Sequence, residues 1–385
     1  MNGPGLIVIG SGPAGLGAAE AFRKHNTDLP VLLVSADPAV PYERPPLSKD
    51  FLRGETDEVA LHPPSWYADH DIELVTGVEI DGLDPAGQFV VIDGDPRPYA
   101  ALVLATGAKP SPLPVDGGEQ ALQLRSLADA ERLRTASAGA QSAVVIGAGF
   151  IGCEAAASLA HRGVAVTLVA PQRVPQQTRL GAEAGQQLLR LVEAAGARYV
   201  GGVSVDAVHE GPAVRLDNGV TIDCDLVLAA TGVVPQSGLA EAAGLEVGQS
   251  RVVVGPDMAT SAPHIFAVGD VALAYNTSAG RRIAVEHWQD AADHGAVAGT
   301  AAAGVDAGWD GVPGFWTTIG DADVKYHAWG DGYRNSRMLP RDDGFTVWYE
   351  RDGATVGVLT LNADDDYDLG ERLIKDGAPP PVPMR

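Results

Sequence analysis

The hydrophobic pattern of the chain repeats one strand–helix–strand order. Near the N-terminus, the apolar run 6–9 stops at glycines and is followed by an alanine-rich stretch of helical spacing, 14–22, and a second apolar run, 31–34. The same order recurs over three later segments, 143–146, 150–160 and 164–169. The pattern therefore predicts two βαβ units of the kind found in doubly wound α/β nucleotide-binding folds.

Two further apolar strands end in the same tripeptide. The run 102–104 leads into Ala105-Thr106-Gly107, and the run 226–229 leads into Ala230-Thr231-Gly232. Each tripeptide lies a comparable distance after its own glycine-rich loop, which indicates that the order of elements of one whole domain occurs twice in the chain. We therefore predict an α/β protein with two Rossmann-type, dinucleotide-binding domains, the second inserted into the first. The first would span 1–108 and 232–304, and the second 109–231.

The pattern changes after about Gly304. The segments 345–349 and 355–359 resemble antiparallel strands, and Pro379–Pro383 reads as an extended terminal strap. We predict a smaller C-terminal α+β domain over 305–385.

Composition excludes several classes of partner. The net charge of −23 over 385 residues would repel a nucleic-acid backbone. No apolar run reaches membrane-spanning length, and Met1–Pro4 lead into the first strand without a basic stretch or a cleavage site. From these features we predict a soluble, cytoplasmic protein with no nucleic-acid or membrane partner. We predict no metal site, and the oligomeric state is not readable from the sequence.

The first glycine-rich loop has the spacing of a dinucleotide-binding motif. It follows a strand, opens a helix and places glycines at 10, 12 and 15, which suit a tight turn, backbone approach to a pyrophosphate and close helix packing. Asp37, beyond the second strand, is the nearest candidate to bind a ribose hydroxyl. A plain turn between strand and helix is the alternative. The predicted loop residues are Gly10, Gly12, Pro13, Ala14 and Gly15.

The second loop has the same context but lacks an acidic partner after its second strand, which ends at Ala170. An acid there would favour NADH, whereas a small residue with Arg173 nearby leaves room for a 2′-phosphate, which favours NADPH. The alternative is that Arg173 and Arg179 are solvated loop cations. The predicted loop residues are Gly147, Gly149, Phe150, Ile151 and Gly152.

Two segments add a family resemblance to these units. Together with the two Ala-Thr-Gly strands, the segment 266–270, Phe-Ala-Val-Gly-Asp, resembles glutathione-reductase-like flavoproteins. The segment 41–49, Pro-Tyr-Glu-Arg-Pro-Pro-Leu-Ser-Lys, is similar to bacterial ferredoxin reductases of oxygenase systems. The resemblance implies FAD on the first loop, with Ala105, Thr106 and Gly107 beside it, and NAD(P)H on the second, with Ala230, Thr231 and Gly232 beside it.

The same resemblance implies a reaction and an acceptor. Hydride would pass from NAD(P)H to flavin N5, and single electrons would then leave to an iron–sulfur protein of an oxygenase or cytochrome P450 system. The resemblance favours a ferredoxin as this iron–sulfur protein, with a rubredoxin as the second choice. Two alternatives stay open: a reductase of a small acceptor such as a quinone or oxygen, and a redox-sensing, partner-binding flavoprotein resembling apoptosis-inducing factor.

Several residues acquire flavin-site roles from this resemblance. Asp270 would accept a hydrogen bond from the flavin ribityl chain, although a helix N-cap is compatible with it. Arg44 and Arg125 would lie near the FAD phosphates or adenosine, and the alternative is a pair of exposed linker arginines. Val78 matches a backbone position that meets the adenine, or is an ordinary strand residue.

The segment 286–288 would meet the pyrimidine edge of the flavin. Backbone amides at a helix N-terminus can stabilise negative charge there. Glu286, His287 and Trp288 form this segment. Trp288 would border the ring or pack in the core, and His287 is interpreted as structural.

Lys49 and Glu154 are the predicted catalytic pair. In the family, the lysine of the Pro-Pro-Leu-Ser-Lys segment pairs with the glutamate just after the second glycine loop, beside flavin N5. A buried lone charge is very costly, so each residue would need the other. Lys49 would stabilise the charge that appears when hydride arrives, and Glu154 would hold Lys49 and line the nicotinamide slot. A surface salt bridge is the alternative for either residue.

The two cysteines, Cys153 and Cys224, are too far apart for a Cys-x-x-Cys pair, and neither lies where disulfide reductases of this superfamily carry theirs. Electrons would therefore leave the flavin for an external acceptor. Cations in the last third could dock an acidic acceptor or be scattered and solvated, namely Arg281, Arg282, Lys325, Arg334, Arg337 and Arg341. The segment 315–320 resembles the tryptophan segment that backs the flavin in the family, but its Thr-Thr-Ile-Gly end departs from the usual polar sequence.

Overall fold

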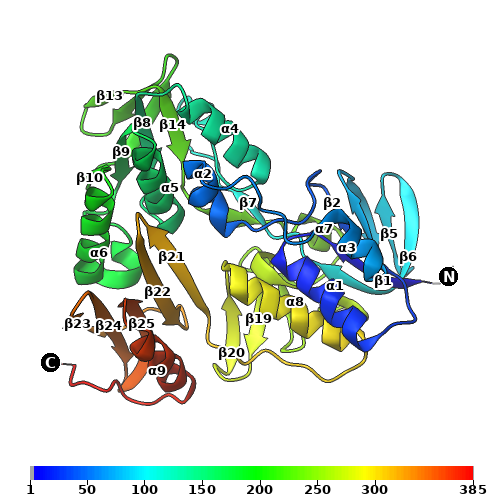
Figure 1. Ribbon diagram of the computed structural model, residues 1–385. Coiled ribbons are helices and arrows are strands. Elements are labelled where there is room, and N and C mark those ends of the chain that lie inside the picture. The colour runs from blue at the N-terminus through cyan, green and yellow to red at the C-terminus, as the bar shows by residue number, and fades with distance from the viewer. Residues whose placement is uncertain (1–3, 385) are drawn as a thin grey trace. The chain divides into compact units, whose positions relative to one another are not determined.

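The computed structural model describes residues 4–384, so Met1–Gly3, on which the expected absence of a leader rests, lie outside the described residues. The chain forms two compact units (Figure 1). Unit 1 comprises Met1–Glu43, Ala60–Lys109 and Val234–Gly314, and unit 2 comprises Arg44–Val59, Pro110–Val233 and Phe315–Arg385. The division into three domains stays a prediction.

Unit 1 is built on a mixed sheet. Four strands, β3-β2-β1-β6, run parallel with β18 added on β6, and the antiparallel strands β5 and β4 continue the sheet beyond β6. These strands are β1 (Gly5–Ile9), β2 (Val31–Ser35), β3 (Ile72–Thr76), β4 (Ile80–Asp84), β5 (Phe89–Ile92), β6 (Asp95–Leu104) and β18 (Ile265–Ala267). The strands β1, β2 and β18 and the second half of β6 are almost entirely apolar and buried, as is usual for parallel strands covered on both faces. Their carboxyl ends therefore point to one edge, where the glycine-rich loop follows β1.

The other elements of unit 1 include a second small sheet of order β16-β17-β19-β20. Its strands are β16 (Val247–Gly248), β17 (Arg251–Val254), β19 (Ala272–Asn276) and β20 (Arg281–Ala284). The helices are α1 (Pro13–His25), α3 (Pro64–Asp69), α7 (Gly238–Ala242), the short 3₁₀ helix η3 (Gly269–Val271) and α8 (Trp288–Ala302). Two of the five boundaries between the units fall within the short strands β7 (Ala108–Pro110) and β15 (Val233–Pro235).

Helices α1 and α8 of unit 1 lie side by side (Figure 1). A Cβ atom on Gly295 would lie 2.1 Å from the Ala14 carbonyl oxygen, and one on Gly299 would lie 2.2 Å from that of Ala18. Only glycine allows the two backbones to approach this closely. The contact fixes the middle of α8 against the first half of α1.

One face of α8 buries two titratable side chains. Burial, with the neighbouring Asp293 carboxylate, raises the pKa of Asp290 well above its usual range. Burial lowers the pKa of His294 from 6.5 to about 3. Neither ring nitrogen of His294 has a hydrogen-bond partner among the described residues, and its ring meets Trp309 edge-on at 4.3 Å between centroids. The folded protein therefore holds His294 neutral.

We predict that His294 makes unit 1 acid-sensitive. Below pH 6.5 His294 binds a proton in the unfolded chain but stays neutral in the folded chain. The free energy of unfolding therefore falls as the pH falls toward 3. Between about pH 7 and pH 5 the wild type should lose roughly 2 kcal/mol more unfolding free energy than His294→Leu does. Urea unfolding at both pH values measures this, with the exposed His209→Gln as the control. Equal losses in all three proteins would contradict the prediction.

Unit 2 contains the second parallel sheet, of order β10-β9-β8-β14. Its strands are β8 (Ser142–Ile146), β9 (Ala165–Ala170), β10 (Arg198–Gly201) and β14 (Leu226–Ala229). The helices are η1 (Pro45–Ser48), α2 (Asp50–Arg53), η2 (Gly118–Gln120), α4 (Leu127–Ser137), α5 (Phe150–His161) and α6 (Gln177–Ala194). A three-stranded antiparallel sheet is formed by β11 (Val205–His209), β12 (Ala213–Leu216) and β13 (Thr221–Asp223).

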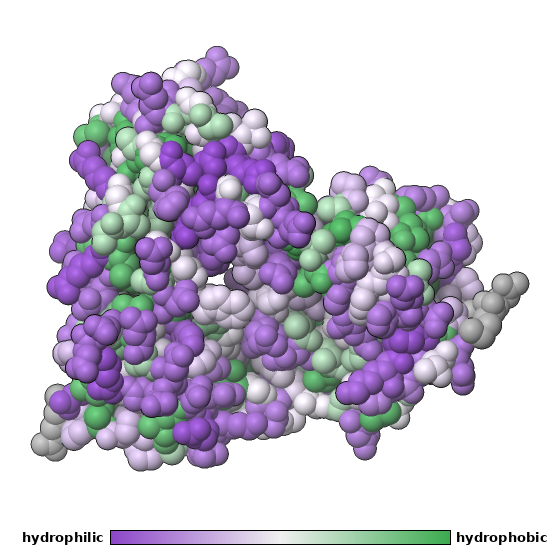
Figure 2. All heavy atoms as spheres, in the orientation of Figure 1, coloured by the Kyte–Doolittle hydropathy of each residue, from purple (hydrophilic) through white to green (hydrophobic). Residues whose placement is uncertain are grey.

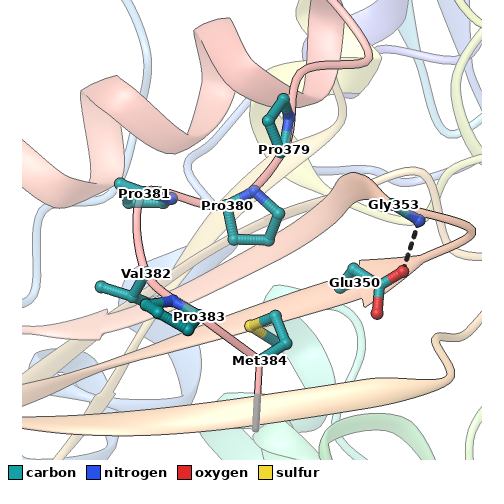
Figure 3. Close-up of a pocket in the computed structure, with 8 residues that line it drawn as sticks. All are labelled: Glu350, Gly353, Pro379, Pro380, Pro381, Val382, Pro383 and Met384. Atoms are coloured by element: carbon teal, nitrogen blue, oxygen red, sulfur yellow. Dashed lines mark hydrogen bonds between the residues drawn. The ribbon is translucent and has the colours of Figure 1, made fainter.

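A five-stranded sheet completes unit 2, in the order β21-β22-β25-β24-β23. It comprises β21 (Gly314–Ile319), β22 (Ala322–Ala328), β23 (Asn335–Arg341), β24 (Gly344–Arg351) and β25 (Ala354–Leu361), and α9 (Asp364–Lys375) packs on it. The proline-rich tail lies extended and lines a surface pocket with Glu350 and Gly353 (Figure 3). The Thr355 amide donates to the Ala378 carbonyl at 2.8 Å, which attaches the tail to the β24–β25 hairpin.

The surface is mostly hydrophilic on the face that Figure 2 shows. No helix in residues 4–384 is long and apolar enough to cross a membrane. Within the same residues, no three His, Cys, Asp or Glu side chains are grouped so that they could hold a metal ion.

Candidate cofactor sites

The loop after β1 is a tight backbone turn at the carboxyl ends of the parallel strands. Gly10 has a φ of +106°, and a Cβ atom there would lie 2.2 Å from the Ala105 carbonyl oxygen. A Cβ atom on Gly15 would lie 1.8 Å from the Gly10 carbonyl oxygen. The Ala105-Thr106-Gly107 segment thus lies against the loop, as its place after β6 implies. Thr106 is held by its hydroxyl, which donates to the Gln236 carbonyl at 2.8 Å.

The loop after β8 repeats this geometry inside unit 2. Gly147 has a φ of +104°, and its Cβ atom would lie 2.4 Å from the Ala230 carbonyl oxygen. A Cβ atom on Gly152 would lie 1.9 Å from the Gly147 carbonyl oxygen. Thr231 donates to the Ser111 carbonyl at 3.3 Å, and Thr231 and Gly232 are exposed. The duplication read from the sequence is therefore present at the level of individual backbone contacts.

Both loops open helices whose first turns have no side-chain cap. Gly12 is the N-cap of α1, with Pro13 and Ala14 following, and Gly149 is the N-cap of α5, with Phe150 and Ile151 following. Uncapped N–H groups at a helix N-terminus carry partial positive charge and bind phosphates. The residues present therefore fit a dinucleotide pyrophosphate at each loop.

The predicted adenosine contacts in unit 1 take part in local turns. Asp37 accepts hydrogen bonds from the Ala39 amide at 3.0 Å and the Tyr42 hydroxyl at 2.8 Å. The Val78 amide donates to the Ser35 carbonyl at 3.2 Å. The Asp37 carboxylate is therefore held in place by the chain itself, at the end of β2. Its role toward a ribose stays a prediction.

Asp270 and the 286–288 segment lie together in unit 1, and Arg251 connects them. The Arg251 guanidinium donates to the Asp270 carbonyl at 3.1 Å and forms an ion pair with Glu286. Asp270 is buried, and a Cβ atom on the preceding Gly269 would lie 3.1 Å from the Ala14 side chain. Sequence reasoning missed Arg251 because its position, at the start of β17, matches no motif.

His287 and Trp288, both half-buried, begin α8. The His287 side chain does not cap the helix, so the N–H groups of the first turn are available to an electron-rich ligand edge. These donors, the buried Asp270 and the uncapped α1 terminus together fit a flavin nucleotide.

Lys49 and Glu154 form a buried ion pair in unit 2. The Lys49 Nζ atom lies 2.8 Å from Glu154 Oε2, and the side chains are 11% and 3% exposed. Lys49 also donates to the Pro45 carbonyl at 3.0 Å. Because an ammonium has three N–H donors, one remains without a partner among the described residues. The surface salt bridge considered above is excluded by this burial.

Two hydroxyls that sequence reasoning did not single out also hold Glu154. Ser48 Oγ donates to Oε2, and Thr317 Oγ1, from β21, donates to Oε1 at 2.6 Å. Ser158 of α5 donates to the Ser48 carbonyl at 2.8 Å, which fixes the backbone of η1 against α5. The only sequence signal for Thr317 was its place in the 315–320 segment.

The remaining predicted residues of unit 2 are more exposed. Arg44 is half-buried at the start of η1. Arg125, also half-buried, precedes α4, and its amide donates to Asp129 in the capping box of that helix. Arg173 is exposed after β9, with its amide bonded to Gln177 at 3.2 Å, and Ile151 is 46% exposed. The structure does not bring Arg125 or Arg173 into contact with the Lys49–Glu154 pair.

Both cysteines are unpaired and buried. Burial raises the pKa of the Cys153 thiol, and the neighbouring Glu154 carboxylate raises it further. Burial also raises the pKa of Cys224. Because the thiolate is the reactive form, neither side chain is suited to redox relay.

Three of the candidate docking cations are paired. Lys325 lies 2.7 Å from Asp364, Arg334 lies 2.7 Å from Asp352, and Arg341 pairs with Asp366. Their charge is therefore compensated within the chain, which weakens the idea of a positive docking patch built from them.

Comparison with known proteins identifies the class. The family model for pyridine nucleotide-disulphide oxidoreductases matches residues 4–295. The chain belongs to this family. It is an FAD-dependent oxidoreductase that uses NAD(P)H.

Similarity to ferredoxin reductases extends over the whole chain. The ferredoxin–NAD(+) reductase component of the anthranilate 1,2-dioxygenase system of Burkholderia cepacia is 33% identical over 99% of this chain and 96% of its own. The rubredoxin–NAD(+) reductase of Pseudomonas putida is 33% identical over 82% of this chain and 84% of its own.

A solved structure agrees with these relatives. The structure of a covalent putidaredoxin reductase–putidaredoxin complex matches with a TM-score of 0.92, at 28% identity, over 98% of this chain and 94% of that one. The likeness confirms the predicted α/β fold with two dinucleotide-binding domains and the resemblance to ferredoxin reductases.

The flavoenzyme should depend on the Lys49–Glu154 pair for stability. Lys49→Met leaves a buried carboxylate without its counter-ion and should cost about 3 kcal/mol of unfolding free energy. Lys49→Met/Glu154→Gln should recover most of that loss because no buried charge remains. Chemical denaturation of the apoproteins measures both, and Arg215→Met, which breaks the exposed pair with Asp206, should cost under about 1 kcal/mol. A double variant no more stable than Lys49→Met would disagree.

Proposed function

We propose that this flavoenzyme is an NAD(P)H:ferredoxin reductase of an oxygenase or cytochrome P450 system. Bound FAD would supply the chemistry that turns one hydride from the nicotinamide into two single electrons. The proposal of an external electron acceptor rests on the burial of both cysteines, because neither thiol of the chain is placed to take electrons from the flavin. An external acceptor is then required, and the likeness to ferredoxin reductases over 99% of the chain supports an iron–sulfur protein.

Unit 1 contributes the residues that would bind FAD. The uncapped N-terminus of α1 would hold the pyrophosphate, Asp270 the ribityl chain, and the first turn of α8 the pyrimidine edge of the ring. The contact of α8 with α1 and the Arg251 bonds hold these groups in one arrangement before any ligand arrives. A site organised in this way favours a cofactor that stays bound.

Lys49 would present its remaining N–H to the flavin beside N5. Glu154 and the Pro45 carbonyl hold the ammonium at 2.8 and 3.0 Å, so it need not reorganise when negative charge develops on the ring. Glu154 would hold the lysine in place through their ion pair and line the slot for the nicotinamide. The loop of Gly147 and the first turn of α5 would hold the coenzyme pyrophosphate.

A ferredoxin is the preferred candidate for the acceptor, and a rubredoxin is the second candidate. Relatives of both kinds match this chain, and the longer match is to the ferredoxin reductase. The net charge of −23 means that an acidic acceptor would dock against a repulsive long-range field, so association should become faster with added salt.

We expect NADH or NADPH to bleach the flavin of the purified holoenzyme at a catalytic rate, and the enzyme to reduce a bacterial [2Fe–2S] ferredoxin. Lys49→Ala should slow flavin reduction roughly a hundredfold, because one preorganised donor is lost, while FAD content stays unchanged. Anaerobic stopped-flow absorbance measures the rate, and the exposed Lys24→Ala should match the wild type. Reduction of a quinone or oxygen but of no ferredoxin or rubredoxin would point to a small-molecule acceptor, and unchanged kinetics in Lys49→Ala would remove its assigned role.

We propose NADPH as the preferred coenzyme. β9 ends at Ala170 rather than at an acid, and the exposed guanidinium of Arg173 follows it. Tyr199 and Gly202 hold the turn between them through the Gln172 carbonyl, at 2.8 and 3.1 Å. Such a turn can place an arginine at a 2′-phosphate.

Arg173→Ala should raise the KM for NADPH about tenfold and leave the KM for NADH unchanged, since only NADPH carries the 2′-phosphate. Steady-state kinetics with both coenzymes measures the ratio. Arg190→Ala, an exposed arginine of α6, is the matched control. An unaltered ratio of the two KM values in Arg173→Ala would refute the preference.

A further inference from the structure

The Glu154 carboxylate receives a hydrogen bond from a strand of the C-terminal sheet. Its Oε2 atom is taken by Lys49 and Ser48, whereas the partner of its Oε1 atom is the Thr317 hydroxyl at 2.6 Å. Glu154 is 2% exposed and Thr317 is 1% exposed. Water therefore does not compete for this contact, and Oε1 depends on a protein donor.

The strand β21 docks on the first turns of α5 through two successive contacts. Side chains alternate along a strand, so Phe315, Thr317 and Ile319 share the buried face and Trp316, 44% exposed, points the other way. Phe315 packs edge-on against Phe150 at 4.6 Å between centroids. Glu154 lies one helical turn beyond Phe150 on the same face of α5, where Thr317 meets it. The aromatic contact thus sets the register that aims the hydroxyl at Oε1.

A hydroxyl at this position needs an explanation beyond packing. The neighbouring residues on the buried face of β21 are apolar, and a valine would fill the volume of Thr317 with no polar group to satisfy. Thr318, which follows it, pairs its own hydroxyl with Asp323 at 2.6 Å near the surface. The two adjacent threonines therefore differ in what they hold, and Thr317 holds the carboxylate of the catalytic pair.

We propose that Thr317 is a positioning residue for flavin reduction, a role that rests on the function proposed above. It acts through Glu154: its hydroxyl fixes the side-chain rotamer of Glu154, and the carboxylate then fixes the Lys49 ammonium, with one N–H left for the flavin. Without the hydroxyl, Oε1 has no donor and the carboxylate can turn toward Lys49 or Ser48. The ammonium would then move from its place beside the Pro45 carbonyl.

The kinetic test compares Thr317→Val with Thr318→Val and Thr317→Ser in the holoenzyme. We expect Thr317→Val to lower the limiting rate of flavin reduction about tenfold, the equivalent of one hydrogen bond, with less than a twofold change in the KM for coenzyme. Thr317→Ser should restore the rate because it returns the hydroxyl, and Thr318→Val should match the wild type. A Thr317→Val enzyme with the wild-type rate, or a loss that serine does not rescue, would overturn the proposal. Thr317→Ala replaces the valine variant if that protein does not fold.

A second readout uses the protein as purified, with no coenzyme and no turnover. The infrared difference between each protein and its Glu154→Gln derivative isolates the carboxylate stretching bands of Glu154. These bands should shift in Thr317→Val, stay in place in Thr318→Val, and return in Thr317→Ser. An unshifted band in Thr317→Val contradicts the contact itself. If NAD(P)H fails to reduce the wild-type flavin, the proposed function fails, whereas the infrared comparison still decides whether Thr317 positions Glu154.

Discussion

The burial of one carboxylate organises unit 2. An ionised glutamate removed from water costs several kcal/mol unless counter-charge and hydrogen bonds replace its hydration. Glu154 obtains them from Ser48 and Lys49, more than a hundred residues before it, and from Thr317, more than a hundred and sixty residues after it. The contacts of Glu154 thus join all three stretches of chain that make up unit 2.

The two nucleotide loops share a backbone geometry, and their surroundings differ. In unit 1 the first turn of α1 is flanked by Gly269, Asp270 and the start of α8, and Arg251 ties these together. In unit 2 the first turn of α5 carries the exposed Ile151, and Arg173 lies exposed beyond β9. A loop flanked by groups that the chain already holds in place would suit a retained cofactor, and a loop with an exposed first turn would suit a coenzyme that exchanges at every turnover. The duplicated fold would then support two unlike tasks through what packs around each loop.

Ion pairs within the C-terminal sheet and α9 affect how the protein could bind an acceptor. Most of the cations that could have formed a basic docking patch in the C-terminal sheet are paired with carboxylates of their own sheet or of α9. Exposed pairs of this kind contribute little stability, but they remove local positive potential. Recognition of an acidic acceptor would therefore rest on shape and short-range contacts more than on long-range attraction.

Short-range sequence signals determined the fold class and both glycine loops. Gly10 and Gly15, and likewise Gly147 and Gly152, stand where the backbone approaches a carbonyl oxygen too closely for any side chain. Because only glycine fits there, the glycine spacing alone identifies both loops. Lys49 and Glu154 were paired through the family resemblance. Tertiary structure alone decided which hydroxyls complete their site: Ser48 and Thr317 lie in the segments 41–49 and 315–320, but nothing in those segments marks them as partners of Glu154. Arg251, which joins Asp270 to Glu286 in unit 1, matches no motif. Their contacts span long stretches of chain, and only folding brings such partners together, because a hydrogen bond depends on position in space rather than on order in sequence.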